Sequence, residues 1–281
     1  MTPSSTNFAM LPAGRTFFKM SGSGNDFIVV NAMKEPAGEL AEASVIQALC
    51  ARGTGVGADG IVFLEPSNVA DFRMVYLNSD GSRADLCGNA SLCSGRLASE
   101  LGIVSSPDFR IESDAGILAA RLRDGVPEVD LQPISEVRAK LPFRLEEGES
   151  WIGFALAGVP HLGVRCQSVD RVDVVGRGRP LRFDPSLAKG ANVNFLAPDG
   201  AGGWLIRTYE RGVEGETLAC GTGAVASAVL LVEAGEAANP VRLRTRSGRT
   251  LTVRLRKSER GWEPSLSGEA RIVFQGQFGE R

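Results

Sequence analysis

Two cysteines occupy matching positions in the two halves of the sequence, and their surroundings suit acid/base chemistry. Cys87 lies in the segment LCGNA and Cys220 in the segment ACGTGA, and each comes where a glycine-rich turn meets an expected helix. The first N–H groups of a helix lack internal partners and carry partial positive charge, which favours a thiolate. A thiolate on one face of a carbon and a thiol on the other can invert a stereocentre.

The helix N-termini can both lower the pKa of the thiols and bind a carboxylate group of a ligand. A free thiol with a pKa of about 8.5 is about 3% ionised at pH 7, whereas one lowered to about 7 is half ionised. The same N–H groups can bind a carboxylate, and Gly88, Gly221 and Gly223 leave the backbone open to a ligand. Two thiols that flank one carbon would share a proton and titrate as a pair.

Short β-type runs and a few helices must position these cysteines. Helical patterns ending at glycines cover residues 39–52, 89–101 and 223–234, and strand patterns cover residues 27–30, 60–64, 72–77 and 204–209. The alternating stretch 241–256 predicts a hairpin around Ser247-Gly248, with Arg242, Arg244 and Arg246 on one face. We interpret that face as solvated, with anion binding as the alternative.

Composition restricts the class of protein. The 281 residues include 31 Lys and Arg against 33 Asp and Glu, and this balance excludes a generic nucleic-acid or membrane-surface binder. Hydrophobic content of 43% predicts a soluble globular protein, and the length of 281 residues predicts about two domains. Residues 1–14 read as a disordered extension. Five cysteines, an odd number, favour a reducing cytoplasm over a disulfide framework, and a single histidine excludes a three-histidine metal site.

Several long motifs follow one another along most of the chain, from about residue 17 to residue 274. They are KMSGSGNDF (19–27), GVGADG (55–60), NSDGS (78–82) with CGN (87–89), GANVNF (190–195), and YERGVEGET (209–217) with CGTG (220–223). This set of motifs resembles that of the diaminopimelate epimerase family. The resemblance implies conversion of LL-diaminopimelate to the meso form, without pyridoxal phosphate or metal, in lysine and peptidoglycan precursor synthesis. It also implies a cytoplasmic homodimer that acts on a small diamino-dicarboxylate.

The resemblance assigns roles residue by residue. Cys87 and Cys220 would be the acid/base thiols, and His161 a possible positioning or proton-assisting group. Substrate would be contacted by Asn25, Asn78, Asn192, Glu210 and Arg211, and its reacting carboxylate held by Gly88, Asn89, Gly221 and Thr222. Arginine can grip a carboxylate with two hydrogen bonds, and a glutamate can take an ammonium group.

The implied fold is α/β, with two pseudo-symmetric domains that each wrap a curved mixed sheet around a central helix. The N-terminal domain would comprise residues 15–131 plus 269–281, and the C-terminal domain residues 132–268, with the active-site cleft between them. Three positions depart from the common family pattern. Ala90 adds a methyl group at a helix start, Leu92 replaces a charged residue, and Val159 stands where many members have asparagine.

Other chemistries fit less well. A proline or hydroxyproline type racemase on the same fold is the nearest alternative, and phenazine-biosynthesis isomerases do not need paired thiols. A Cys/His hydrolase could pair His161 with either cysteine, but the second matched cysteine would then have no role. The spacing of Cys87 and Cys93 is unlike the Cys-x-x-Cys of zinc sites and dithiol oxidoreductases. A non-enzymatic binding protein would not need both cysteines.

Overall fold

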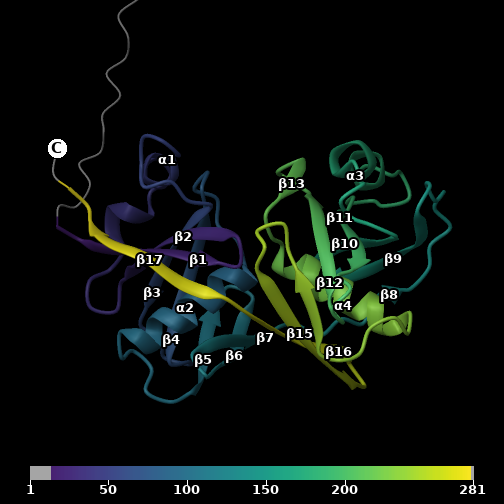
Figure 1. Cartoon of the computed structure of the whole chain (residues 1–281). Coiled ribbons are helices and arrows are strands. Elements are labelled where there is room, and N and C mark those ends of the chain that lie inside the picture. Colours follow the sequence, from purple (N-terminus) through teal and green to yellow (C-terminus); the bar gives the residue numbers. More distant parts are fainter. Residues whose placement is uncertain (1–13, 280–281) are drawn as a thin grey trace, which may run out of the picture.

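The computed structural model describes residues 14–279, in which the strands form one continuous mixed sheet folded into two lobes (Figure 1). The first lobe contains β1 (Thr16–Gly22), β2 (Asn25–Asn31), α1 (Ala43–Cys50), β3 (Gly60–Glu65), β4 (Phe72–Asn78), α2 (Gly88–Glu100), β5 (Asp108–Ser113), β6 (Gly116–Arg123) and β7 (Val126–Asp130). A short 3-10 helix, Gly38–Ala41, precedes α1. Of the predicted extension 1–14, all but Gly14 lies outside the described residues.

The second lobe repeats this order of elements, with the short strands β8 and β13 added. It contains β8 (Val137–Arg138), β9 (Glu149–Ala157), β10 (Val159–Cys166), α3 (Val174–Arg182), β11 (Asn192–Pro198), β12 (Trp204–Glu210), β13 (Gly215–Thr217), α4 (Gly221–Glu233), β14 (Val241–Arg244), β15 (Thr250–Ser258) and β16 (Gly261–Gly268). The last strand, β17 (Ala270–Gln277), returns to the first lobe and pairs with β1 (Figure 1, yellow).

Strand pairing follows the same pattern in both lobes. In the first, β2 and β3 are parallel, β3 and β4 antiparallel, and β4 and β5 parallel. In the second, β10 and β11 are parallel, β11 and β12 antiparallel, and β12 and β14 parallel. The lobes are joined through the antiparallel pair of β7 and β16. The architecture is therefore a sheet-dominated α/β fold with few helices and an internal repeat.

The central helices α2 and α4 are enclosed rather than laid on a surface. The largest core packs around both and spans the two lobes, while smaller cores lie beside α1 and α3. All the residues from Gly88 to Gly95 and from Gly223 to Leu230 are buried. An enclosed helix has no polar face, which explains the small and apolar residues on all sides of α4.

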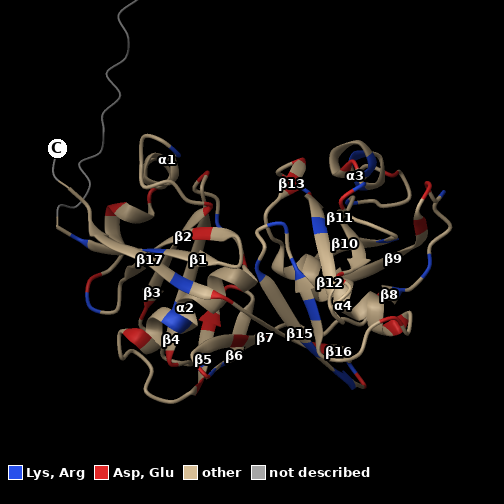
Figure 2. Ribbon diagram, viewed as in Figure 1, with Lys and Arg blue, Asp and Glu red and all other residues tan. Residues whose placement is uncertain are grey.

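The predicted helices that carry the cysteines are confirmed, and one helix, α3, was not predicted from the sequence. α2 and α4 lie within two residues of the predicted ranges, and Gly102 and Gly235 follow them with positive φ. The predicted helix 39–52 is shorter and divided, since only 38–41 and 43–50 are helical. The hairpin at Ser247-Gly248 forms as predicted, and Figure 2 shows Lys and Arg along the ribbon around β15.

Candidate active site

The two cysteines hold the same position on the two enclosed helices. Cys87 is the N-cap of α2 and Cys220 the N-cap of α4, and their backbones are extended with nearly equal angles (φ −132°, ψ 115° and φ −139°, ψ 111°). The strand, turn and helix before and after them repeat, which gives the same local backbone. Each thiol therefore lies at the positive end of its helix.

The two helix N-termini converge on one side chain, Leu266 of β16. A Cβ placed on Gly88 would lie 2.9 Å from Leu266 Cδ2, and one placed on Gly221 would lie 3.2 Å from the same atom. The Cβ placed on Gly221 would also lie 3.6 Å from Oδ1 of Asn89, a residue of the other helix. The structure therefore brings four predicted carboxylate-binding residues together: Gly88, Asn89, Gly221 and Thr222.

The thiols are sheltered and free of disulfide bonds. Cys220 is 9% exposed, and its Sγ accepts a hydrogen bond from the Gly223 N–H at 3.4 Å and lies 3.5 Å from the Thr222 hydroxyl. Burial raises the pKa of Cys87 to about 11 and that of Cys220 to about 12. The expectation of a lowered pKa is wrong for the free site, because desolvation outweighs the helix N–H groups.

Glu210 ends β12 and influences both thiols. It is half-buried and accepts a hydrogen bond from the Thr217 hydroxyl at 2.7 Å. Burial raises the pKa of its carboxyl, and the negative charge of Asp59 raises it further. The charge of Glu210 in turn contributes to the raised pKa of Cys87 and of Cys220. Glu210 is therefore a carboxylate whose charge acts on both thiols, in a partly desolvated environment.

A chain of polar side chains fixes Asn25 and Asn89. Asn89 Nδ2 donates to Asn25 Oδ1 at 2.7 Å, and Asn25 Nδ2 donates to Asp59 Oδ2 at 2.9 Å. Arg52 Nη2 binds the other oxygen of Asp59 at 2.8 Å. Within residues 14–279, the buried Oδ1 of Asn89 has no hydrogen-bond partner. The amide orientations of both asparagines are thus set before a ligand arrives.

His161, Asn192 and Arg211 gather at the edge of β10 and β11. His161 is fully buried opposite Asn192 in the parallel pair, and Asn192 Oδ1 accepts the Arg211 backbone N–H at 2.7 Å. The His161 Nδ1 accepts from Asn194 Nδ2 at 3.2 Å, which places the ring proton on Nε2. That Nε2 has no partner among the described residues. Burial, with the positive charge of Arg211, lowers the pKa of His161 to about 3.

In the described part of the chain, the side chains of Asn78 and of the three residues that depart from the family pattern are not hydrogen-bonded to the polar groups described above. The Asn78 side chain donates to the Ser82 hydroxyl at 3.0 Å within its own turn, and no hydrogen bond joins it to another predicted site residue within 14–279. Ala90 and Leu92 are fully buried in the largest core, so Leu92 packs among apolar side chains. Val159 is half-buried at the start of β10, near His161.

Three further residues belong to the site and were not singled out from the sequence. Asp59 holds Asn25, and Asn194 joins His161 to α4, since a Cβ on Gly223 would lie 2.4 Å from Asn194 Oδ1. Tyr76 lies on the same face of β4 as Asn78, and burial raises the pKa of its phenol, with Cys87 contributing. Both Asp59 and Asn194 lay inside motifs used for the resemblance.

The β1–β2 turn crosses to the second lobe beside Cys220. Gly24 has φ +122°, and a Cβ there would lie 2.8 Å from Ser247 Cβ and 3.1 Å from Ala219 Cβ. Ser247 Oγ donates to the Ser23 carbonyl at 2.8 Å. Glycine is required at this position both for its conformation and for the close approach.

We predict that Gly24→Ala lowers the free energy of unfolding by about 1–3 kcal/mol through backbone strain, and also lowers turnover because the turn leads directly to Asn25. Gly248→Ala is the matched control, since Gly248 has φ +79° but nothing within 4 Å of the added methyl group. Chemical denaturation and steady-state kinetics check both effects. Equal losses in the two variants would contradict the role of the close approach.

Within 14–279, no group of three or more His, Cys, Asp and Glu side chains is placed to hold a metal ion. No helix in the same range is long and apolar enough to cross a membrane.

Comparison with known proteins shows the family of this chain. The family described as Diaminopimelate epimerase matches residues 17–133 and 154–273. The diaminopimelate epimerase of Gemmatimonas aurantiaca is 45% identical over 274 residues, which cover 94% of this chain and 99% of that protein.

Solved structures with low identity share the fold. The Bacillus anthracis phenazine biosynthesis protein of the PhzF family superposes with a TM-score of 0.75 at 15% identity, covering 94% of this chain and 98% of the other. A probable proline racemase from Agrobacterium radiobacter K84 gives 0.68 at 19% identity, covering 94% and 92%. With the family match and the close relative spanning nearly the whole chain, this protein belongs to the diaminopimelate epimerase family.

Proposed function

We propose that this chain interconverts LL- and meso-diaminopimelate without pyridoxal phosphate, using Cys87 and Cys220 as its two acid/base groups. The observation that carries the proposal is the matched N-cap position of the two cysteines on helices that converge at Leu266. Membership of the family gives the substrate class. A base and an acid on opposite faces of the α carbon are what inversion of that carbon requires.

In each turnover one thiolate removes the α proton and the opposite thiol delivers its own proton to the other face. The carbanion is a short-lived intermediate whose charge spreads onto the carboxylate. We assign its stabilisation to the N–H groups of Gly88, Asn89, Gly221 and Thr222, which need no reorientation during the reaction. After one turnover the thiolate and the thiol have exchanged roles, so the reverse reaction uses the same groups.

One thiol must lose a proton before the reaction begins, because both are protonated in the free site at neutral pH. We propose that Glu210 accepts that proton. Burial raises the pKa of its carboxyl toward those of the thiols, and its charge acts on both cysteines. The α-ammonium group of bound substrate would stabilise the thiolate that remains.

We assign the far end of the substrate to the polar groups around β10 and β11. Arg211 would bind the distal carboxylate, with Asn192 fixing the Arg211 backbone and the unpartnered Nε2–H of His161 available as a donor. Asn25 would contact the substrate from the first lobe, and Asn78 would need its side chain to leave Ser82. These roles are supported by proximity and hydrogen-bonding capacity.

We also propose the wider setting that the family implies. The substrate would enter between an N-terminal domain (15–131 plus 269–281) and a C-terminal domain (132–268), a division supported by the end of β7 at Asp130 and the return of β17 to β1. The protein would act as a cytoplasmic homodimer on a small molecule, in lysine and peptidoglycan precursor synthesis, with no nucleic-acid or membrane partner.

Proton NMR of the reduced protein with LL-diaminopimelate in deuterated water tests the proposal. We expect deuterium at the α position together with meso product, because each proton is delivered by a thiol that exchanges with solvent. A parallel reaction with L-proline is the control and should show no exchange. Exchange of proline with unchanged LL-diaminopimelate would assign the thiol chemistry to a different substrate, and no exchange with either compound would refute the proposed activity.

A further inference from the structure

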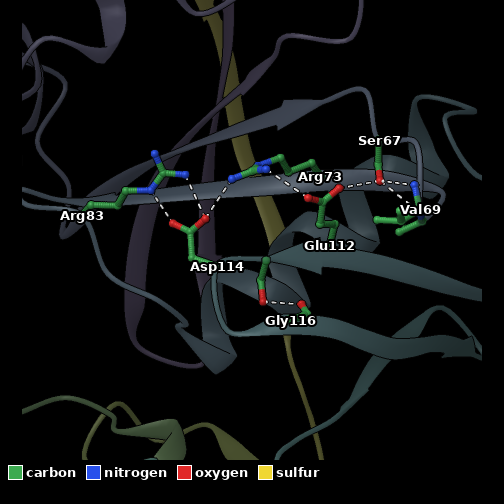
Figure 3. A network of polar contacts seen from close by, with 9 residues as sticks. Ser67, Val69, Arg73, Arg83, Glu112, Asp114 and Gly116 are labelled. Atoms are coloured by element: carbon green, nitrogen blue, oxygen red, sulfur yellow. Dashed lines mark hydrogen bonds and ion pairs between the residues drawn. The ribbon is translucent and has the colours of Figure 1, made fainter.

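The loop that leads to Cys87 carries a branched cluster of ion pairs, which we call the fork and which consists of Arg73, Arg83, Glu112 and Asp114. Figure 3 shows Arg83 paired with Asp114, and Arg73 reaching both Asp114 and Glu112. Arg83 Nη2 and Arg73 Nη2 each donate to Asp114 Oδ1 at 2.9 Å. Glu112 is held in turn by the Ser67 hydroxyl at 2.6 Å. Asp114 is only 18% exposed, so its charge is sheltered between two guanidinium groups.

The fork joins the loop to the tip of the next hairpin. Arg83 belongs to the segment between β4 and α2, whereas Asp114 belongs to the turn between β5 and β6. Beside the ion pair, the backbone N–H of Ala115 donates to the carbonyl of Asp85 at 3.1 Å. One backbone bond and one ion pair therefore connect the loop to the tip of the hairpin just before Cys87. The loop is also paired with β4, where the Ala84 N–H donates to the Tyr76 carbonyl at 3.3 Å.

The second lobe holds the loop before Cys220 in the same way. The backbone N–H of Ser247, at the tip between β14 and β15, donates to the carbonyl of Leu218 at 3.0 Å. Asp85 and Leu218 both lie two residues before their cysteine. The backbone bond is thus repeated at equivalent positions.

The ion pair is repeated as well, with its charges reversed. Glu216 lies four residues before Cys220, as Arg83 lies four before Cys87. Glu216 pairs with Arg246 of the hairpin tip at 3.8 Å, and a strand arginine, Arg207, binds it through two contacts of 2.7 Å. Opposite charges at corresponding positions make the same connection between loop and hairpin.

We propose that these two ion pairs, Arg83 with Asp114 and Glu216 with Arg246, are positioning devices that fix the two thiols for inversion. The proposal rests on the proposed function. The pairs touch neither thiol, and each acts through the loop that ends in a cysteine. In each pair the arginine is more than half exposed, and an ion pair with a solvated partner contributes little to stability, so the expected effect is on geometry. A displacement of about 1 Å at reacting groups can reduce turnover as much as a hundredfold.

Because the ion pair of the second lobe has its charges reversed, exchanging the two charges in the first lobe tests the proposal. We expect Arg83→Met to lower kcat about tenfold with KM changed less than twofold, because Cys87 shifts while the distal-end residues lie on other elements. The double variant Arg83→Glu/Asp114→Arg copies the arrangement of the other lobe and should recover kcat to within about threefold of the wild type. Asp114→Asn offers a second single variant if Arg83→Met does not fold.

The matched control is Arg123→Met. Arg123 pairs with Asp108 on the same hairpin, away from the loop, and its side chain is 52% exposed, as is that of Arg83. It should leave kcat unchanged. The proposal is overturned if Arg83→Met keeps kcat within twofold of the wild type, or if the double variant is as slow as the single variants.

Peptide-resolved alkylation by iodoacetamide separates this proposal from the proposed function. Loosening the loop in Arg83→Met should speed alkylation of Cys87 at least fivefold and leave that of Cys220 within twofold, with the double variant again close to the wild type. If the wild type does not turn over LL-diaminopimelate but this pattern appears, the ion pair positions Cys87 and the substrate assignment fails. Unchanged alkylation of Cys87 would overturn the proposal whatever the activity.

Discussion

Replacing either Cys87 or Cys220 with alanine will abolish conversion of LL-diaminopimelate to the meso form. Each variant keeps one thiol, yet inversion needs a base on one face of the carbon and an acid on the other. Positioned acid/base groups commonly contribute between a hundredfold and ten-thousandfold to a rate, and we expect kcat to fall by at least about a thousandfold. Proton NMR in deuterated water measures both product formation and exchange at the α carbon.

The variant Cys166→Ala provides the matched control. Cys166 is buried in the second lobe, where its Sγ faces the Val164 carbonyl at 3.5 Å, and it lies outside the turns that carry the site thiols. Its replacement should leave kcat within about twofold of the wild type, because the variant removes a thiol, as the other two variants do, but not one that would contact the substrate. Retention of epimerisation in Cys87→Ala or in Cys220→Ala would contradict the two-thiol mechanism.

The matched pair of cysteines was accessible from the sequence because short-range chemistry encodes it. A β-type run, a turn, a cysteine and glycines occur in the same order twice, and each feature acts locally on strand, turn and helix N-terminus. The same local rules predicted α2 and α4 to within two residues. The repeat then placed both thiols on equivalent elements.

The helix α3 was missed because its composition argues against a helix. Gly176, Gly178 and Pro180 all lie inside it, and each disfavours a helical interior. Packing explains the result, because a Cβ on Gly178 would lie 2.6 Å from Tyr209 Cβ, so only glycine lets the helix lie this close to β12. Asp173, which caps the helix through the Gly176 N–H, was the available signal.

Electrostatic properties were the least accessible from the sequence. The helix N-terminus suggested lowered thiol pKa values, but the depth of burial depends on contacts between distant segments, and it raises them. The ion pairs at Arg83 and Glu216 were hidden for another reason. Their charges are opposite in the two lobes, so a comparison by residue type finds no repeat where the structure has one.

Glu210→Gln is expected to move activity and thiol reactivity in opposite directions. Loss of the negative charge lowers the pKa of both thiols, because Glu210 contributes to raising each, so alkylation of Cys87 and Cys220 at pH 9 should become faster. Loss of the proton acceptor should at the same time lower kcat by about a hundredfold, within the range for a positioned acid/base group. A structural defect alone would lower activity without this shift in the pH profile of alkylation.

Glu214→Gln is the control for Glu210→Gln, because it removes a carboxylate four residues away that pairs with Arg182 and does not raise the pKa of either thiol. It should leave the alkylation profile and kcat near those of the wild type. Iodoacetamide labelling across pH 7–11, read separately for the two cysteine peptides, and steady-state kinetics give both measurements. If Glu210→Gln leaves the thiol pKa values unchanged, Glu210 does not act on the thiols. If kcat stays within threefold, another group accepts the thiol proton.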